Sequence, residues 1–476
     1  MAAAERQETG SKVTLLTLAA MVIGSMVGAG VFNLPSRFAR ETGVAGALVA
    51  WAIAGAGMLM LAFVFQTLAI RKPQLDSGVY AYAKAGFGQY LGFFSAFGFW
   101  ASACAGNTFY WVLIMSTVGA VAPVLGEGDT LLAAVLSSVG VWFFYWLIRR
   151  GVKQAASINR IVTFAKVIPI LFFIVLCLFY LDPHVFAENF RGGAYGSLFS
   201  QVTGTMLVTV FVFQGIESAS AYSRHAKRRE DVGQATLLGF LSVLAVFASV
   251  TIVSYGIIPY QQIADLRQPS MGGVLEAAVG EWGKVFISVG LIVSVLGAYL
   301  AWTLMAAEVL FVAAKDDDMP RFLRRTSGDD VPSAALLMST LLVQIMLFVL
   351  LFASNALDLA LDLTAALALI PYLLAAGYAL KLAITRETYD DPSGRGRDLV
   401  VGALATIYTV FLLYAAGPTF LLLSFILLAP GTILFVMARR EQGKRLFSAG
   451  ELIIFAISIF GAIAGVVALA TGAITI

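Results

Sequence analysis

Long apolar segments separated by short polar loops run along almost the whole chain. Most of these segments are long enough to cross a bilayer as one helix, which takes about 20 residues. A β-barrel would instead show shorter segments in which apolar and polar residues alternate. The pattern predicts thirteen spans, at 13–36, 43–70, 89–123, 130–148, 156–181, 198–222, 233–258, 280–312, 333–353, 357–384, 398–416, 418–438 and 449–474. We therefore expect an all-α polytopic membrane protein.

Basic residues gather in the loops on one side of the predicted membrane. The opposite loops hold only Arg37, Arg40, Arg191, Arg267 and Lys284. Because lysine and arginine stay on the cytoplasmic side, we expect the N-terminus, with a tail at 1–12, in the cytoplasm. An odd number of spans then puts the C-terminus outside. The first span is too long for a cleavable signal peptide and is expected to be retained.

Composition excludes several classes of protein. Of 476 residues, 60% are hydrophobic and only 12% are charged, whereas soluble domains are about a quarter charged. The net charge of +3 gives no reason to expect a nucleic-acid partner. Two cysteines and two histidines form no cluster, so we expect no metal site, and no Walker motif is present. Without a nucleophile, base and cofactor set, the sequence predicts neither an enzyme nor a cofactor.

Three glycines interrupt the first span within the sequence IGSMVGAGVFNLP, at Gly24, Gly28 and Gly30. Each glycine costs a helix interior about 1 kcal/mol relative to alanine. Two interpretations are open. Gly24 and Gly28 can form a small-residue surface for close helix packing. Alternatively, the helix breaks at Gly28–Gly30 and its backbone N–H groups face a ligand.

Two ionisable residues stand out well inside predicted spans, where a charge costs at least about 2.5 kcal/mol on insertion scales. Glu217 follows Gly215 in FVFQGIESASAY, five spans after the first glycine-rich break, which is the pattern expected of an inverted-repeat transporter. The alternative is that Glu217 merely lies near the cytoplasmic end of its span. Lys166 either reaches the cytoplasmic interface through its long side chain or places an ammonium group inside the helix bundle.

Other polar and aromatic residues allow two interpretations each. Asn107 is a mid-span amide, suited to a ligand or to an interhelical hydrogen bond. Trp302 lies in the middle of its segment, where it either packs against neighbours or offers a ring face to a cation. Asp358 and Asp362 open the tenth span, where we expect solvated side chains that attract cationic solutes.

Several motifs together resemble one transporter family. They are GSMVGAGVF in the first span, SGVYAYAKAGFGQYLGF after the second, AASINRIVTFAKVIPI in the fifth, FQGIESAS in the sixth and AWTLMAAE in the eighth. In this order they resemble the amino acid–polyamine–organocation transporters, over about residues 13–440. Within that superfamily, the chain is most similar to the basic amino acid/polyamine antiporters, and among these to the arginine/ornithine exchangers.

The resemblance implies a five-plus-five inverted repeat, with repeats at 13–181 and 198–384, additional helices at 398–476, and broken helices at spans 1 and 6. It implies a substrate site at Met26, Gly28, Ala29, Gly30, Asn107, Phe211, Gln214, Trp302 and Thr364, and coupling or gating positions at Lys166, Glu217 and Tyr372. The substrate carboxylate would meet the N–H groups of Gly28–Gly30, at the positive end of a half-helix. Its side chain would run along Trp302 toward Thr364.

Two residues depart from the family pattern. Ala29 stands where many relatives have serine, so we expect the carboxylate to be held by backbone alone. Phe211 stands where arginine/agmatine exchangers have a stacking tryptophan, which weakens any cation–π contact. This second departure argues against agmatine as the substrate.

The resemblance implies exchange of cationic amino acids across a bacterial cytoplasmic membrane, arginine for ornithine, with lysine as a further candidate. The alternative is proton-coupled uptake of an amino acid or polyamine, with Lys166 or Glu217 as the titrating group. A sensor or scaffold would need a signalling domain, and a channel would need a filter sequence or charged rings. The sequence shows neither feature. The partners expected are the substrate and the lipid bilayer, and the oligomeric state is left open.

Overall fold

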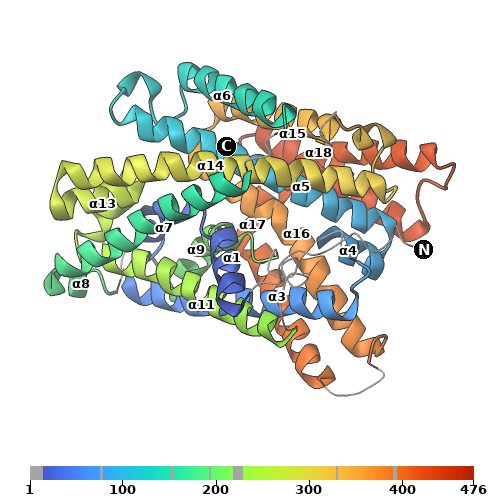
Figure 1. Ribbon diagram of the computed structural model, residues 1–476, viewed down its shortest axis with the longest axis horizontal. Coiled ribbons are helices and arrows are strands. Elements are labelled where there is room, and N and C mark those ends of the chain that lie inside the picture. Colours follow the sequence, from blue (N-terminus) through green and yellow to red (C-terminus); the bar gives the residue numbers. More distant parts are fainter. Residues whose placement is uncertain are drawn as a thin grey trace.

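Helices make up the fold. In the computed structural model the described residues, 14–75, 79–151, 155–191, 195–217, 229–327, 331–389 and 394–475, form helices and no strand (Figure 1). In chain order the helices are α1 (Leu15–Met26), η1 (Ala29–Asn33), α2 (Leu34–Ala39), α3 (Val44–Arg71), α4 (Val79–Phe87), α5 (Gln89–Gly119), η2 (Pro123–Leu125), α6 (Leu131–Arg149), α7 (Ala155–Phe179), α8 (Pro183–Glu188), α9 (Leu198–Phe213), α11 (Arg229–Ser254), α12 (Tyr260–Ala264), α13 (Ser270–Val279), α14 (Glu281–Lys315), η4 (Arg321–Arg324), α15 (Ser333–Val349), η5 (Leu350–Phe352), α16 (Ala356–Thr385), α17 (Arg395–Glu441) and α18 (Ala449–Ala470). The all-α fold class is confirmed. The predicted tail at 1–12 lies outside the described residues.

Among the described residues, eight helices are long and apolar enough to cross a membrane, or nine spans if one bent pair counts as one. Each of the thirteen predicted segments overlaps at least one helix of the described chain, although in the sixth segment the helix α9 ends at Phe213. The numbers differ because α7 and α9 count only as shorter apolar helices and α17 counts once, although it covers two predicted segments. α5, which has 31 residues, is the fourth difference, because it is not among the eight candidate spans.

A backbone turn divides α17 into the two helices that the sequence predicts. Gly417 has φ 70° and ψ 174°, which is outside the helical region, and Pro418 follows it. Proline has no N–H and favours the first position of a helix, so a new helix starts directly after the turn. The predicted boundary between 398–416 and 418–438 therefore falls at this glycine.

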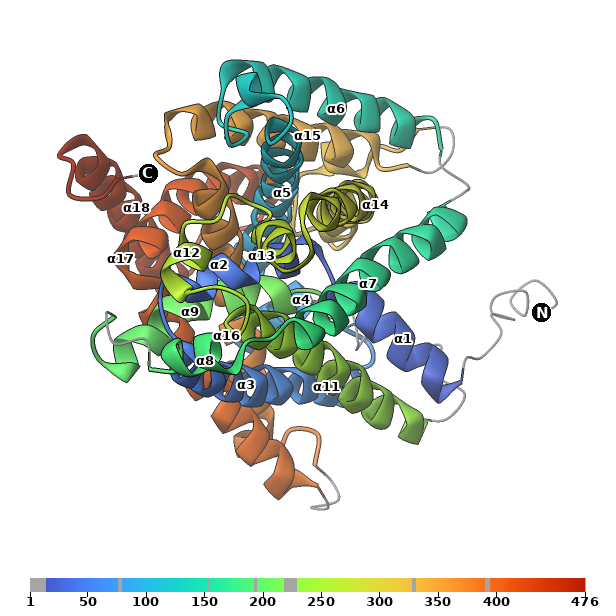
Figure 2. The ribbon, with the colours of Figure 1, turned by 90° about the vertical axis from the view of Figure 1, so that its left-hand side faces the viewer.

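The central helix is α5, of which nearly every residue is buried. It packs against α14 and α16, and the first part of the chain, α1, packs against α11 (Figure 2). α17 and α18 lie together at one edge of the bundle, and α6 lies with α15 at another (Figure 2). Apolar side chains on the outer helices, such as Ile457 and Phe460 of α18, are exposed, as expected of a surface that faces lipid.

Candidate functional site

The first predicted span is broken at its glycines. α1 ends at Met26, and Gly28 has an extended backbone, with φ −114° and ψ −163°. The helix resumes at Ala29, and its two parts, Leu18–Met26 and Ala29–Ala39, differ in direction by 50°. The first N–H groups of a helix have no acceptor within the helix, and Gly28 offers no side-chain cap. The broken-helix interpretation of this stretch therefore agrees with the structure.

The sixth predicted span is broken as well. α9 ends at Phe213, and Gln214 leaves the helix with φ −57° and ψ 140°. Gly215 has φ 103°, a conformation that favours glycine. A Cβ built on Gly215 would lie 2.2 Å from the carbonyl oxygen of Ser25, which leaves no room for a side chain. The hydroxyl of Ser25 donates to the Gly215 carbonyl at 3.2 Å, so the two breaks are in contact.

A small cavity lies between the two breaks, with a volume of about 20 Å³, which is room for one water molecule. Eight of the nine predicted substrate residues line it: Met26, Gly28, Ala29, Gly30, Phe211, Gln214, Trp302 and Thr364. These residues come from α1, η1, α9, α14 and α16 and from the two breaks. The predicted substrate residues, which are far apart in the chain, therefore lie around one cavity.

Asn107 is the predicted substrate residue that does not line the cavity. Its side-chain amide donates to the hydroxyl of Thr303 on α14 at 3.2 Å. Gly106, the preceding residue, lines the cavity instead, and a Cβ built on it would lie 3.3 Å from Thr364. Asn107 therefore makes the interhelical hydrogen bond that its alternative interpretation expects, next to the cavity residue Trp302.

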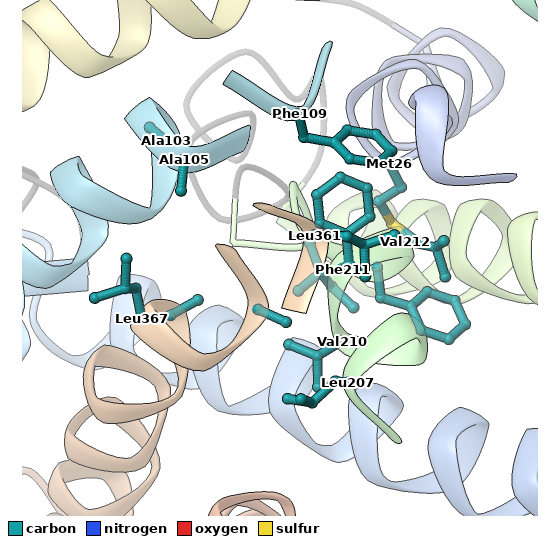
Figure 3. Close-up of a cluster of buried hydrophobic side chains, with 14 of the residues drawn as sticks. Met26, Ala103, Ala105, Phe109, Leu207, Val210, Phe211, Val212, Leu361 and Leu367 are labelled. Atoms are coloured by element: carbon teal, nitrogen blue, oxygen red, sulfur yellow. The ribbon is translucent and has the colours of Figure 1, made fainter. Parts of the chain in front are cut away.

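An aromatic pair lies at one wall of the cavity, where Phe211 lines it. Phe211 and Phe109 contact edge to face, with ring centroids 4.8 Å apart. Figure 3 shows Phe109 and Phe211 close together, with Met26 and Val212 beside them. A Cβ built on Gly30 would lie 2.7 Å from the Phe211 ring, so only glycine lets this ring approach the first break so closely.

The end of α9 is tied to two other helices by hydrogen bonds. The Gln214 amide donates to the hydroxyl of Ser102 on α5 and to the carbonyl of Thr364 on α16, each at 3.2 Å. The hydroxyl of Ser102 donates to the same carbonyl at 2.7 Å. Gln214 therefore both lines the cavity and connects the end of α9 to α5 and α16.

Glu217 lies directly at the second break. Its carboxylate accepts the backbone N–H of Gly215 at 3.1 Å and the hydroxyl of Tyr372 on α16 at 2.9 Å. Tyr372 is fully buried, and Glu217 is only 9% exposed. Glu217 and Tyr372, both predicted gating residues, thus form one buried unit that links the second break to α16.

Lys166, the third predicted coupling residue, lies inside the bundle rather than at its surface. The side chain is 7% exposed, and its ammonium group lies 3.5 Å from the carbonyl oxygen of Gly24, near the end of α1. Carbonyls near the C-terminal end of a helix lack N–H donors from the helix and favour a cation. Lys166 therefore places its ammonium group at the carbonyl end of α1, next to the first break.

The two aspartates expected to be solvated are paired instead. Arg37 of α2 binds Asp358 at 3.1 Å and Asp362 at 2.5 Å, and Arg40 also binds Asp358. Asp362 is only 7% exposed. The expectation was wrong because sequence alone does not show that α2, far away in the chain, covers the start of α16. This cluster attaches the second half of the first broken helix to α16.

Sequence reasoning missed four residues that line the cavity: Ser25, Gly106, Tyr110 and Val212. Helical spacing offered a signal for one of them. Tyr110 follows Asn107 by three positions and Gly106 by four, so it shares a face of α5 with them. A tyrosine in a buried helix is nevertheless usually a packing residue, and nothing else in the sequence distinguishes it.

The fold defines a polytopic membrane protein with two broken helices and a small cavity between them. The chain belongs to the amino acid permease family, whose model matches residues 13–422. It is 47% identical to the arginine/ornithine antiporter of Pseudomonas aeruginosa, over 99% of this chain and 100% of that protein. It is 39% identical to the L-lysine transport protein of Corynebacterium glutamicum, over 98% of this chain and 97% of that protein.

A third relative has a different second substrate. The arginine/agmatine antiporter of Chlamydia pneumoniae is 34% identical, over 94% of this chain and 95% of that protein. The family and these relatives are transporters, which confirms the expectation that the chain is a multi-pass membrane transporter and not an enzyme.

Proposed function

We propose that the protein exchanges cationic amino acids across the membrane, arginine for ornithine. The observation that carries this proposal is the cavity between the two breaks, lined by eight of the residues that the family resemblance assigns to substrate. The 47% identity to an arginine/ornithine antiporter over the full chain supports the choice of substrates. Lysine is a further candidate because a lysine transport protein is 39% identical.

The amino acid's own charges fit the two breaks. Its carboxylate would bind the N–H groups of Gly28, Ala29 and Gly30, where backbone donors are free of the helix ladder. Its α-ammonium would bind carbonyls near Met26 and at 211–214. Its cationic side chain would then lie along the Trp302 ring, whose face attracts cations, toward Thr364. Both Trp302 and Thr364 line the same cavity as the glycines.

A cavity of about 20 Å³ is far too small for an amino acid, so transport requires the site to open. We assign this opening to movement of the broken helices against α5 and α16, in the manner of carriers with inverted repeats. The proposed repeats are 13–181 and 198–384. Lys166 at the first break and the pair of Glu217 and Tyr372 at the second are the proposed gating contacts.

The proposed topology places the N-terminus in the cytoplasm of a bacterial cell and, after thirteen spans, the C-terminus outside. The concentration of basic residues in alternate loops supports it. Thiol labelling of a single cysteine introduced at residue 476 in intact cells, in a background with Cys104 and Cys177 replaced, tests it. Labelling only after permeabilisation would contradict the external C-terminus.

Exchange is tested with purified protein in liposomes. Liposomes preloaded with ornithine should take up labelled arginine at least about tenfold faster than empty liposomes. Protein-free liposomes provide the control for leakage. Equal rates with and without internal ornithine would reject exchange, because a carrier that returns empty needs no internal substrate.

Proton-coupled uptake is a second candidate, which the buried ammonium group of Lys166 beside the first break favours. In the same liposomes, an imposed pH gradient distinguishes the two functions. Accumulation of arginine in empty liposomes, driven by the gradient alone, would support symport. Uptake that follows internal ornithine and ignores the gradient supports exchange.

A further inference from the structure

Tyr110 of α5 points its hydroxyl into the cavity at the first break. The residue lines the cavity and is only 5% exposed. A Cβ built on Gly28 would lie 3.7 Å from the hydroxyl oxygen, and this is the nearest atom that such a Cβ would meet. The hydroxyl therefore lies close to the backbone where the helix ladder is interrupted.

Within the described part of the chain, no protein atom forms a hydrogen bond with the Tyr110 hydroxyl. Two other buried tyrosines do have partners: Tyr255 donates to the Thr42 carbonyl at 2.7 Å, and Tyr372 donates to Glu217. Buried tyrosine hydroxyls usually find a partner, because an unpaired buried polar group is costly. A hydroxyl that faces a ligand cavity has its partner supplied when the ligand binds.

The chemistry of the first break indicates which group of the ligand would be the hydrogen-bond partner of the Tyr110 hydroxyl. Gly28, Ala29 and Gly30 bring backbone N–H groups and no side-chain donor. A carboxylate has two oxygens and accepts up to about four hydrogen bonds. A carboxylate that accepts hydrogen bonds from these backbone N–H groups can still accept another. The Tyr110 hydroxyl lies across from Gly28, where it can donate that bond.

We propose that Tyr110 donates a hydrogen bond to the carboxylate of the bound amino acid and is a specificity-determining residue for it. This inference rests on the proposed function, and it replaces the expectation that backbone alone holds the carboxylate. A phenol is neutral and therefore strengthens carboxylate binding without repelling the α-ammonium beside it. Its hydroxyl favours amino acids over amides and amines that have the same cationic side chain.

The test is a binding measurement on purified Tyr110→Phe protein, with arginine and argininamide as ligands. Argininamide keeps both cationic groups but lacks the carboxylate. The variant should bind arginine about 10- to 100-fold more weakly, the range for a lost hydrogen bond to a charged group. Its affinity for argininamide should change less than about threefold. Equal losses for both ligands, or an unchanged affinity for arginine, would overturn the proposal.

Tyr408→Phe is the matched control. Tyr408 is 6% exposed, and its ring packs against Gly57 of α3 rather than into the cavity. Its variant should keep both affinities, and the thermal unfolding of both variants shows whether each is folded. Exchange in ornithine-loaded liposomes is measured separately with the wild type. If exchange fails while the arginine-to-argininamide ratio still depends on Tyr110, the proposed function falls and the role of Tyr110 stands.

Discussion

The two breaks differ in how their exposed backbone N–H groups find hydrogen-bond acceptors. Each exposes backbone donors inside a membrane protein, where water is scarce and every polar group needs a partner. At the second break the protein supplies the acceptor, because the carboxylate of Glu217 binds the N–H of Gly215. At the first break, Gly28 offers no side-chain cap and the N–H groups adjoin the cavity.

The difference indicates what each break does. At the second break the carboxylate of Glu217 already accepts the exposed N–H group, so this donor needs no ligand. Tyr372 of α16 donates to the same carboxylate and connects this break to α16. At the first break the donors face a cavity, and in the proposed function a substrate carboxylate would be their acceptor. Changes at the second break should therefore impair folding or turnover, whereas changes at the first break should alter ligand affinity.

The largest effect is expected for Gly215→Ala. Its positive φ costs a non-glycine residue about 1–2 kcal/mol, and the new methyl group would press on the backbone of Ser25 at 2.2 Å. The melting temperature should fall and exchange should be lost. Gly450→Ala in α18 meets no atom within 4 Å and is the control. A normal melting temperature for Gly215→Ala would show that the breaks do not meet as described.

Glu217→Gln should have the next largest effect. The amide still accepts one hydrogen bond, but the charge that strengthens the bonds from Gly215 and Tyr372 is lost, at a cost of about 1.5–3 kcal/mol. The maximal rate of exchange should fall at least about tenfold, with arginine affinity changed less than about threefold. Undiminished exchange would remove Glu217 from the mechanism.

Tyr372→Phe removes only one of the two donors to Glu217, because Gly215 keeps its bond. We expect the exchange rate to fall about three- to tenfold, consistent with the loss of a single hydrogen bond of about 1 kcal/mol. The rate of the double variant with Glu217→Gln should be close to that of Glu217→Gln alone. Independent, multiplying effects would show that the two residues do not act as one unit.

The smallest effects on stability are expected at the first break, where two glycines provide an internal comparison. Gly30→Ala presses on the Phe211 ring at 2.7 Å, so the ring must shift, whereas the nearest atom to a methyl group on Gly28 is 3.7 Å away. Gly30→Ala should lower the melting temperature by a few degrees. Gly28→Ala should leave it unchanged while weakening arginine binding, because its methyl group lies between the backbone and Tyr110. The reverse order of melting temperatures would contradict this geometry.

Local conformation was predictable from sequence because it depends on local residue types. Glycines in an apolar segment predict the break at Gly28–Gly30, and a glycine followed by a proline explains the turn at Gly417. The family resemblance added the residues that surround the cavity. Neither source determines which face of a helix meets which neighbour. For that reason Asn107 was expected in the cavity that Gly106 and Tyr110 line, and Asp362 was expected in solvent although it binds Arg37, 325 positions away.

The small cavity at the first break bears on the stoichiometry of transport. A carrier that changes conformation without substrate would enclose the backbone N–H groups of the first break in a cavity of about 20 Å³. The one water molecule that fits there cannot accept a hydrogen bond from all of them. Each unpaired buried donor costs about 1–3 kcal/mol, and about 1.4 kcal/mol slows a rate tenfold. In the proposed function, the carboxylate of a bound amino acid would remove this cost. We therefore expect the empty return to be slow relative to the loaded one, which would tie the exit of one amino acid to the entry of another.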